Sequence, residues 1–600
     1  MTSVADARLT LSLPQGRTIV SAAVIAAVLL LGLLSVIGLD YSLKSIETTG
    51  ENLRRFAQMA LPMQWPGFEV TGTRQPNGTT AFTTRWVGLD PVREVITAIA
   101  MTLALVIAGT ALAALLSIPV AYGAARNTTP HHIVMIICRG IGIVTRAIPD
   151  IVFVVFLAFL WFNSGTLPAI VAIGLHSIGM ISKMFADAIE QIDDGPRQAI
   201  RSAGGSRAQE FWVGVIPHAL PAWIAVALHR ADINLRGSVI LGIVGVAGLG
   251  HELDEALHTG PSGMRSAIPL VIIIIALCML FEIVSSMVRA RMLGVTPTGR
   301  RFGDRIVRGV LRRRPPRPAT PSATRDALER NARIEAAMHR PWTRGRLTAA
   351  AWAWVALALV VAAVFVADPD LGRLLRPWSW DQVSNAELDR AVWPPNFGGR
   401  AWADVLDAVV TTLQIAFAAT FMSTVVSAIV GPLSARNVAP NPATRAIFRG
   451  LALFLRAVPD LVVAIVFIIA TGFGPQAGAL ALGIGGVGLL AKLIGDSMEE
   501  VPSGPERSLT AAGARRTQTF ASATVPMAFP ALVSHLMYLL EQNVRSATLL
   551  GVVGAGGIGF LLINALQGRH FDQVFAYVLV IIAMVAAVEA TAMLVRRLAR

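Results

Sequence analysis

The sequence predicts an all-α protein that crosses a membrane many times and is built from two parallel six-helix repeats. Three observations predict this fold. Of the 600 residues, 54% are hydrophobic and only 15% are charged, whereas soluble proteins carry about 25% charged residues. Twelve apolar stretches are long enough to span a bilayer, which takes about 20 residues. The second half of the chain also repeats the first.

The predicted spans divide six and six along the chain. The first half contains 18–39, 95–122, 133–162, 166–185, 216–246 and 266–290, and the second half contains 347–367, 402–431, 445–472, 475–494, 525–555 and 572–596. The first span begins after two Arg residues, as a signal peptide would. Its apolar run is longer than the core of a signal peptide, and no cleavage site of small residues follows it. We therefore interpret it as an uncleaved span.

The repeat is visible in short motifs that recur at a nearly constant offset. RAIPD (146–150) recurs as RAVPD (456–460), AARN (124–127) as SARN (434–437), and GIVGVAGLG (242–250) as GVVGAGGIG (551–559). The chain is therefore interpreted as a tandem fusion of two copies of one module. We place the first module at 1–290, an Arg- and Pro-rich linker at 291–346, and the second module at 347–600.

The orientation follows from the charges. Segment 289–346 holds 16 Arg against four acidic residues, a net charge of +12 out of the chain's +14. A basic run can bind nucleic acid, but next to membrane spans it is typical of a cytoplasmic loop. We therefore expect the linker and both termini in the cytoplasm, and no nucleic-acid partner. An even number of spans per module makes the two copies parallel.

Within the linker, 312–321 is too rich in Arg and Pro to form a buried helix. Segment 322–340 has the pattern of a short amphipathic helix. Such a helix could lie on the anionic inner leaflet of the membrane. The alternative is a solvated tether between the modules.

The polar stretches between spans four and five, 187–214 and 496–523, have the same layout in both copies. Each has a Gly-Pro break, a short helix, a Gly, and a second short helix that runs to a Pro. They contain AIRSAGGSRAQEFWVGVIPHALP (199–221) and SLTAAGARRTQTFASATVPMAFP (508–530). Both resemble the coupling-loop signature of ABC-importer permeases, in which Glu-Ala-Ala precedes a Gly and then an Ile-x-Leu-Pro. We call the two stretches the coupling loops.

The resemblance implies that the matching residues contact a cytoplasmic ATPase. These are Gln198, Ala203, Gly204 and Pro217 in the first copy, and Glu506, Ala512, Gly513 and Pro526 in the second. The signature's Glu is absent, since Gln198 and Arg507 stand in its place. The resemblance implies the type I ABC-importer permease fold, a location in the bacterial cytoplasmic membrane, and two copies of an ATPase partner. ATP and Mg²⁺ would bind that partner, and no cofactor is expected in this chain.

Span five narrows the resemblance to the permeases of phosphonate transporters. HRADINLRGSVILGIVGVAGLG (229–250) and LEQNVRSATLLGVVGAGGIG (540–559) are similar to them. The resemblance implies import of a phosphonate that an extracytoplasmic binding protein delivers. Another oxyanion, such as phosphite or phosphate, or methionine is the alternative substrate.

Charged residues inside the spans are the candidates for the substrate pathway, because intramembrane charges are costly and face the bundle interior. Asp232 and Arg236 lie four residues apart on one helix face, and Glu541 and Arg545 repeat them. An Arg fork suits the charged tetrahedral oxygens of a phosphonate. The alternative is that these pairs only hold span five to its neighbours. The predicted pathway residues are Asp232, Asn234, Arg236, Glu541, Asn543, Arg545, Arg146 and Arg456.

Prolines and glycines mark candidates for a gate or hinge. A Pro-Asp pair lies within span three of each module, where Pro breaks the helical hydrogen-bond ladder. The Gly-rich ends of span five allow tight packing or a broken helix. The predicted gate residues are Pro149, Asp150, Pro459, Asp460, Gly245 and Gly554.

The sequence offers no support for catalysis. A Walker A loop needs a Lys between Gly and Ser or Thr, and none of the three Lys follows a Gly. His251-Glu252 opens like a zinc motif, but Glu255 stands where the second His would be. No catalytic residue and no metal ligand is assigned, which disfavours an intramembrane enzyme. We expect a transport subunit, and an ion-coupled secondary carrier is disfavoured by the paired coupling loops.

Overall fold

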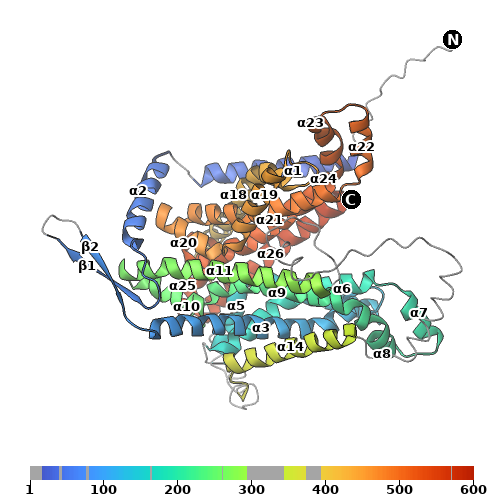
Figure 1. Cartoon of the computed structure of the whole chain (residues 1–600), viewed down its shortest axis with the longest axis horizontal. Helices are drawn as coiled ribbons and strands as arrows, with labels where there is room; N and C mark the ends of the chain where they lie inside the picture. Colours follow the sequence, from blue (N-terminus) through green and yellow to red (C-terminus); the bar gives the residue numbers. More distant parts are fainter. Residues whose placement is uncertain are drawn as a thin grey trace, which may run out of the picture.

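The computed structural model describes residues 16–39, 43–75, 80–161, 165–242, 244–259, 261–292, 344–372, 394–568 and 570–599. Apart from one β-hairpin, the regular elements among these residues are helical. The predicted linker segments 312–321 and 322–340 lie outside the described residues. The long helices run side by side along the longest axis of the molecule (Figure 1). The all-α membrane fold predicted from the sequence is confirmed.

The two modules contain corresponding elements in the same order. The first module has α1 (Gly16–Gly38), α2 (Leu43–Ala60), β1 (Phe68–Arg74), β2 (Thr80–Trp86), α3 (Asp90–Ala124), α4 (His132–Ala147), α5 (Asp150–Leu160), α6 (Thr166–Gln191), α7 (Gly195–Ser202), α8 (Arg207–Gln209), the π-helical turn η1 (Glu210–Val215), α9 (Ile216–Gly242), α10 (Leu249–His258) and α11 (Pro261–Met292). The second has α14 (Arg344–Ala367), α18 (Trp402–Ser434), α19 (Pro442–Ala457), α20 (Asp460–Thr471), α21 (Pro475–Glu500), α22 (Ser503–Ala511), α23 (Arg516–Thr519), η2 (Phe520–Thr524), α24 (Val525–Leu550), η3 (Gly551–Ala555), α25 (Gly557–Gln567) and α26 (Phe571–Ala599).

Ten of the described helical stretches are long and apolar enough to cross a membrane, or twelve if each of two bent helix pairs counts as one span. These twelve coincide with the twelve predicted spans. The bent pairs are the third span of each module, and each is broken where the sequence places a Pro-Asp pair. The helix axes turn by 87° between α4 and α5 and by 85° between α19 and α20. Each turn lies at the Pro-Asp pair, because Pro cannot donate to the ladder and restricts the residue before it.

The fifth span also ends differently from its prediction. It starts with a π-helical turn and stops at the Gly-rich motif, after which a further helix follows, α10 or α25. Gly245 and Gly554 have φ angles of +81° and +101°, which L-residues with a side chain rarely adopt. The two predicted hinge glycines therefore form the turn between consecutive helices. The sequence analysis missed α10 and α25 because both are short and partly apolar.

The first helix of each module packs against the other module. Helix α1 lies along α18, and α14 lies along α3, on opposite sides of the bundle (Figure 1). Gly32 permits a close approach, since a Cβ there would be 2.5 Å from Phe421 Cβ and 2.8 Å from the Phe417 carbonyl oxygen. Ala363 and Ala367 of α14 share a buried cluster with residues of α3. Small residues at such contacts are typical of membrane helices, because they let two backbones approach.

The segment between α1 and α3 forms structure that the sequence analysis did not predict. Helix α2 contacts both α20 of the second module and α11 of the first. The Asn52 amide donates to the Ala470 carbonyl at 3.1 Å. The antiparallel hairpin β1–β2 pairs from Phe68 with Trp86 to Arg74 with Thr80, and Phe82 packs under Arg265 at 4.4 Å. Helix α2 and the hairpin cap one end of the bundle, opposite the coupling loops (Figure 1).

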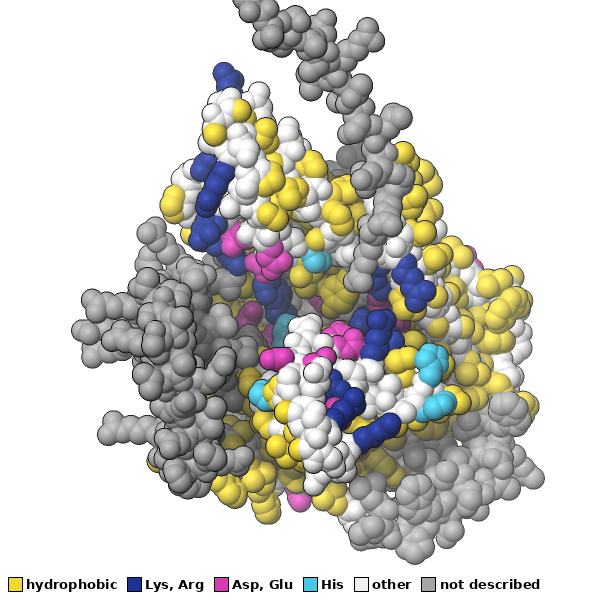
Figure 2. Space-filling view, turned by 90° about the vertical axis from the view of Figure 1, so that its right-hand side faces the viewer, with side chains coloured by type: hydrophobic (Ala, Val, Ile, Leu, Met, Phe, Trp, Pro, Cys, Tyr) yellow, Lys and Arg dark blue, Asp and Glu magenta, His cyan; other side chains and the backbone are white. Residues whose placement is uncertain are grey.

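The end that bears the coupling loops is strongly charged. Figure 2 shows Lys and Arg side chains on two lobes there, with acidic and His side chains in the hollow between them. The flanks of the bundle instead expose large apolar side chains, such as Leu30 (57% exposed), Trp354 (70%) and Phe365 (79%). Exposed apolar surface of this extent is explained by lipid, which accepts side chains that water would not.

The close contact of α1 with α18 gives a first prediction. Gly32→Ala should destabilise the protein by about 1–3 kcal/mol, because the added methyl must displace Phe421 or the backbone of Phe417. Thermal unfolding of the purified chain in detergent measures the change. Gly50→Ala is the matched control, because no atom lies within 4 Å of a Cβ at Gly50 and Ala is the better helix former. Equal stability of the two variants would contradict the packing role of Gly32.

Candidate functional site

A cavity of about 470 Å³ lies between the two modules. Its walls come from α6 and α9 of the first module, from α21 and α24 of the second, and from the broken third span of each. Of the predicted pathway residues, five line it: Asn234, Arg236, Arg456, Asn543 and Arg545. Asp232, Glu541 and Arg146 do not line it. Of the predicted gate residues, Pro149, Asp150, Pro459 and Asp460 line it, whereas Gly245 and Gly554 do not.

Arg456 of the second module reaches into a group of charges on the first. Its guanidinium lies 3.4 Å from Asp232 and 3.8 Å from Glu282. Asp232 also binds Arg236 at 2.6 Å, and Arg236 donates to the Arg456 backbone carbonyl at 2.6 Å. We call Asp232, Arg236, Glu282 and Arg456 the first cluster. It holds two acids and two bases, all inside the helical bundle, so its charges compensate each other.

Arg146 of the first module makes the corresponding contact with the second. Its side chain pairs with Glu589, and its Nε donates to a Glu589 carboxylate oxygen at 3.1 Å. Beside it, Glu541 binds Arg545 at 3.3 Å and Arg596 at 3.7 Å. We call these five residues the second cluster. Arg146 and Glu589 are nearly fully buried, with side chains 10% and 2% exposed.

The two clusters bring together residues that the sequence analysis predicted as separate sets. The Arg of span three in one module meets the Asp-Arg or Glu-Arg pair of span five in the other. Breaking a buried ion pair by removing one partner costs about 3–5 kcal/mol, so each cluster holds the modules together. The sequence analysis missed Glu282, Glu589 and Arg596. Glu282 and Glu589 are acids in otherwise apolar spans, which is a signal of function by itself.

The predicted Asn residues connect helices within each module. The Asn234 amide donates to Thr110 at 2.9 Å and its carbonyl accepts from Ser177 at 3.2 Å. The Asn543 amide donates to Thr420 at 2.9 Å. Hydrogen bonds between membrane helices of this kind fix how the helices pack. Both Asn therefore tie span five to the second span of its own module.

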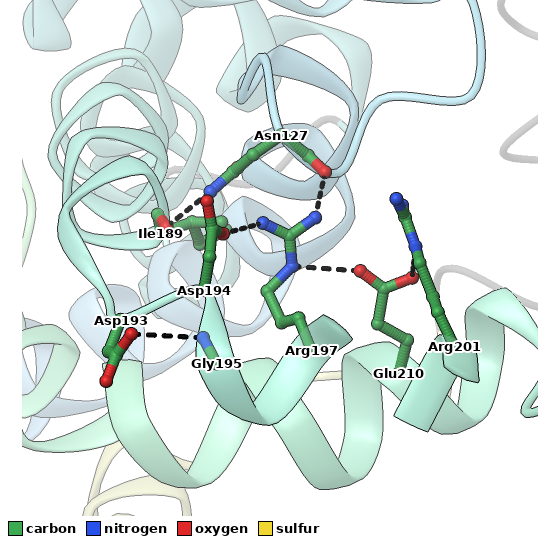
Figure 3. A network of polar contacts seen from close by, with 8 residues as sticks. All are labelled: Asn127, Ile189, Asp193, Asp194, Gly195, Arg197, Arg201 and Glu210. Atoms are coloured by element: carbon green, nitrogen blue, oxygen red, sulfur yellow. Dashed lines mark hydrogen bonds and ion pairs between the residues drawn. The ribbon is translucent and has the colours of Figure 1, made fainter. Parts of the chain in front are cut away.

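The first coupling loop is held by a buried ion pair (Figure 3). Arg197 of α7 binds Glu210 at 2.9 Å and Asp194 at 2.5 Å, and it donates to the Asn127 carbonyl. Glu210 also accepts from Arg201 at 2.8 Å. The Asn127 amide in turn donates to Ile189, near the end of α6, at 2.8 Å. The motif AARN is thus the anchor of the first coupling loop.

The second coupling loop uses the same anchor with different charges. Glu506 of α22 accepts from the Asn437 amide at 2.9 Å and from the Thr524 hydroxyl at 2.7 Å. Asn437 also donates to Met498, near the end of α21, at 2.8 Å. In the repeat, Arg197 is the counterpart of Glu506. Glu210 therefore provides in the first copy the carboxylate that Glu506 provides in the second. Gly204 and Gly513 end their helices with φ angles of +78° and +85°, as helix C-termini often require.

The remaining residues of the predicted ATPase contact lie within the coupling loops or at their ends. They are Gln198, Ala203 and Pro217 in the first module, and Ala512 and Pro526 in the second. Ala203 and Ala512 end α7 and α22, and their N–H groups bond back to Ala199 and Ser508. Pro217 and Pro526 lie at the start of α9 and α24. Among the described residues, no group of three His, Cys, Asp or Glu side chains could hold a metal ion.

A family model, the binding-protein-dependent transport system inner membrane component, matches residues 117–294 and 427–599. The chain belongs to this family. The two matches include both coupling loops and every residue of the two clusters. A transport-system component of this kind is thus present twice in one chain, which explains the repeat. Helices α1 and α2 and the hairpin lie outside the matched regions.

Three curated relatives of this chain are named as permeases for phosphate, phosphite or phosphonate. The phosphate-import permease protein PhnE of Mycolicibacterium smegmatis is 37% identical over 505 residues, 83% of this chain and 84% of the relative. The phosphite transport system permease protein PtxC of Stutzerimonas stutzeri is 38% identical over 215 residues, 36% of this chain and 77% of the relative. The putative cryptic phosphonate transport system permease protein PhnE2 of Escherichia coli K12 is 39% identical over 110 residues, 18% of this chain and 90% of the relative.

The second cluster of this transport component gives a prediction that a double-mutant cycle can test. Arg146→Met or Glu589→Met alone should destabilise the chain by about 3 kcal/mol, because each leaves a buried charge without its partner. The double variant should lose less than the sum of the two. Thermal unfolding in detergent gives the comparison. The exposed pair Glu51–Arg55 is the control, and Glu51→Met should change little. Strict additivity at Arg146 and Glu589 would refute the coupling.

The first coupling loop gives a second prediction. Arg197→Met should speed hydrogen exchange of the α7 amides, because Glu210 and the Asn127 carbonyl both lose a buried donor. Mass spectrometry of the full chain measures this locally. Arg201→Met is the matched control: it removes a contact to the same carboxylate, but its side chain is 59% exposed. If both variants exchanged alike, the buried pair would not be what orders the loop.

Proposed function

We propose that this chain is the complete membrane pore of an ABC importer for phosphorus oxyanions. The observation that carries the proposal is the cavity between the modules, which Arg236, Arg456 and Arg545 line together with the Arg230 side chain. Guanidinium groups match the geometry and charge of a tetrahedral oxyanion. A cavity between two parallel repeats is also where transporters of this plan bind their substrates.

Phosphonate is the substrate class that the resemblance of span five implies. Phosphate is the second candidate, favoured by the relative that covers 83% of this chain, which carries the name of a phosphate-import permease. Phosphite is favoured by a shorter match. All three ligands present the same charged tetrahedral oxygens to the protein, so the cavity accommodates each by the same chemistry. A methionine zwitterion presents a planar carboxylate and an ammonium group to these donors, not a tetrahedral oxyanion.

The charged end of the molecule supports a partner on that side (Figure 2). In the proposed assembly, two copies of a cytoplasmic ATPase dock on the coupling loops, and they bind the ATP and Mg²⁺. A binding protein docks at the opposite end, near α2 and the hairpin. The 16 Arg of segment 289–346 keep the linker, the coupling loops and the termini in the cytoplasm.

Closure of the ATPase pair would push the two coupling loops together. Because each loop is tied to the end of the fourth span through Asn127 or Asn437, the push moves α6 and α21 as rigid bodies. Those helices line the central cavity. The broken third spans and the Gly turns absorb the movement, since irregular backbone at membrane depth is tolerated where it lines a cavity.

Uptake tests the proposal. A strain that lacks the gene and any paralogous permease should lose growth on methylphosphonate, phosphite or phosphate, supplied as the sole phosphorus source, for at least one of the three. Labelled phosphate and methylphosphonate report uptake directly, and a plasmid copy of the gene should restore it. Unchanged uptake of all three compounds in the deletion strain would refute the oxyanion substrate.

A further inference from the structure

Arg230 is a buried cation that makes no direct ion pair among the described residues. It lies in α9, it is 7% exposed, and it lines the central cavity. Its one hydrogen bond among the described residues runs from Nε to the Ser177 hydroxyl at 2.9 Å. Of the carboxylates that the structure describes, none lies within the 4.0 Å of a salt bridge. The Asp150 carboxylate is near enough to interact with the Arg230 charge, but a buried cation without a direct ion pair is costly, which points to an anionic ligand.

The other arginines of the cavity differ from Arg230 in this respect. Arg236 and Arg456 both bind Asp232, and Arg545 binds Glu541. Each of these three arginines therefore has a carboxylate within the distance of an ion pair. A substrate that bound these arginines would have to displace a carboxylate that is already in place. An anion can bind Arg230 without displacing a carboxylate, so Arg230 is the stronger binding residue for it.

A chain of hydrogen bonds orients the Arg230 side chain. Its Nε donates to Ser177, the Ser177 hydroxyl donates to Asn234, and Asn234 donates to Thr110. All four residues are nearly fully buried. The chain occupies only the Nε of Arg230, so both terminal NH₂ groups remain as donors. Two parallel N–H donors are the fork that binds oxyanions in a bidentate manner.

His176 keeps the nearby Asp150 away from this fork. Its Nε2 lies 2.9 Å from the Asp150 carboxylate, and its Nδ1 lies 2.9 Å from the Ile148 carbonyl oxygen. Both ring nitrogens thus face oxygen atoms of the broken third span. His176 also bridges the break between α4 and α5, since Ile148 follows α4 and Asp150 begins α5. It is a positioning residue. Its contact with the Asp150 carboxylate competes with an ion pair between Asp150 and Arg230.

The second module has no such site. Leu539 stands where Arg230 stands in the first module, and Gly485-Gly486 replace His176-Ser177. A Cβ at Gly485 would meet the Asp460 carboxylate, and one at Gly486 would be 3.2 Å from Leu539 Cδ1. Asp460 lines the cavity and, among the described side chains, has no ion-pair partner. The second module therefore places a Leu and an acidic side chain, and no donor fork, at the place that corresponds to Arg230.

We infer that the transported oxyanion binds off the pseudo-twofold axis, at Arg230 of the first module, with His176 holding Asp150 out of the way. The inference rests on the proposed function, since it names where that substrate binds. The ligand class is a small tetrahedral phosphorus oxyanion. Arg236 and Arg456 instead link the two modules.

Ligand-dependent thermal stability of the purified full chain tests the site. Phosphate, phosphite or methylphosphonate should raise the melting temperature of the wild type, whereas chloride at equal ionic strength should not. In Arg230→Leu, the concentration that gives half of the rise should increase at least about tenfold, the effect of losing a charge-assisted hydrogen bond. Leu is the residue of the second module at this position, so the matched reverse variant Leu539→Arg can be compared.

Stability without ligand separates this role from a structural one. Arg230→Leu should unfold at the same temperature as the wild type or higher, because it removes a buried charge that makes no direct ion pair. Arg236→Leu should unfold at a lower temperature, because it leaves Asp232 with less compensation. An unchanged phosphate response in Arg230→Leu would overturn the site, as would a wild type that responds to none of the three anions. Uptake in cells is measured separately, so the proposed function could survive either result.

A rescue experiment tests His176. His176→Gly, which copies Gly485, should lose the phosphate response, because Asp150 is then free to pair with Arg230. The double variant His176→Gly with Asp150→Asn should regain it, since the competing carboxylate is gone. A merely structural role would give no rescue. A full phosphate response in His176→Gly alone, or no recovery in the double variant, would overturn the positioning role.

Discussion

A charge that leaves water for the interior of a membrane must be compensated, and the arrangement of this molecule depends on that constraint. Each module receives an Arg from the third span of the other, and this Arg pairs with acidic side chains of the fifth or sixth span. Neither Arg146 nor Arg456 has its carboxylate partner in its own module. The clusters thus require two modules in contact, and the cavity between them follows from the same contact.

The repeated parts of the fold could be predicted from sequence because they follow local rules. Apolar length located the twelve spans, and Pro-Asp and Gly motifs located the breaks. The four-residue spacing also put Asp232 and Arg236 on one helix face, where they pair at 2.6 Å. The spacing of residues along the chain does not indicate which residue of the other module they contact. Arg456 meets Asp232 because two helices from different modules cross there, and nothing near either residue indicates that crossing.

The sequence analysis selected the polar residues that both copies contain, and for this reason it missed Arg230. Asp232, Asn234 and Arg236 drew attention because Glu541, Asn543 and Arg545 repeat them. The structure shows that the repeated charges are mostly engaged with each other. Arg230 and His176 have Leu539 and Gly485 as counterparts, so a search for repeated polar residues passes over them. Helix α2 and the β-hairpin were missed similarly, since they form outside the repeated spans.

The difference between the copies has a physical reason in the fusion itself. A pore made of two identical chains would place each residue twice about its axis, so Arg230 would share the same cavity with a second copy of itself. Two like charges in a low-dielectric cavity repel each other strongly, and both would have to be neutralised by one small anion. A fused chain can keep the Arg in one copy and a Leu in the other. Only one cation then needs a ligand, and that requirement matches one transported oxyanion.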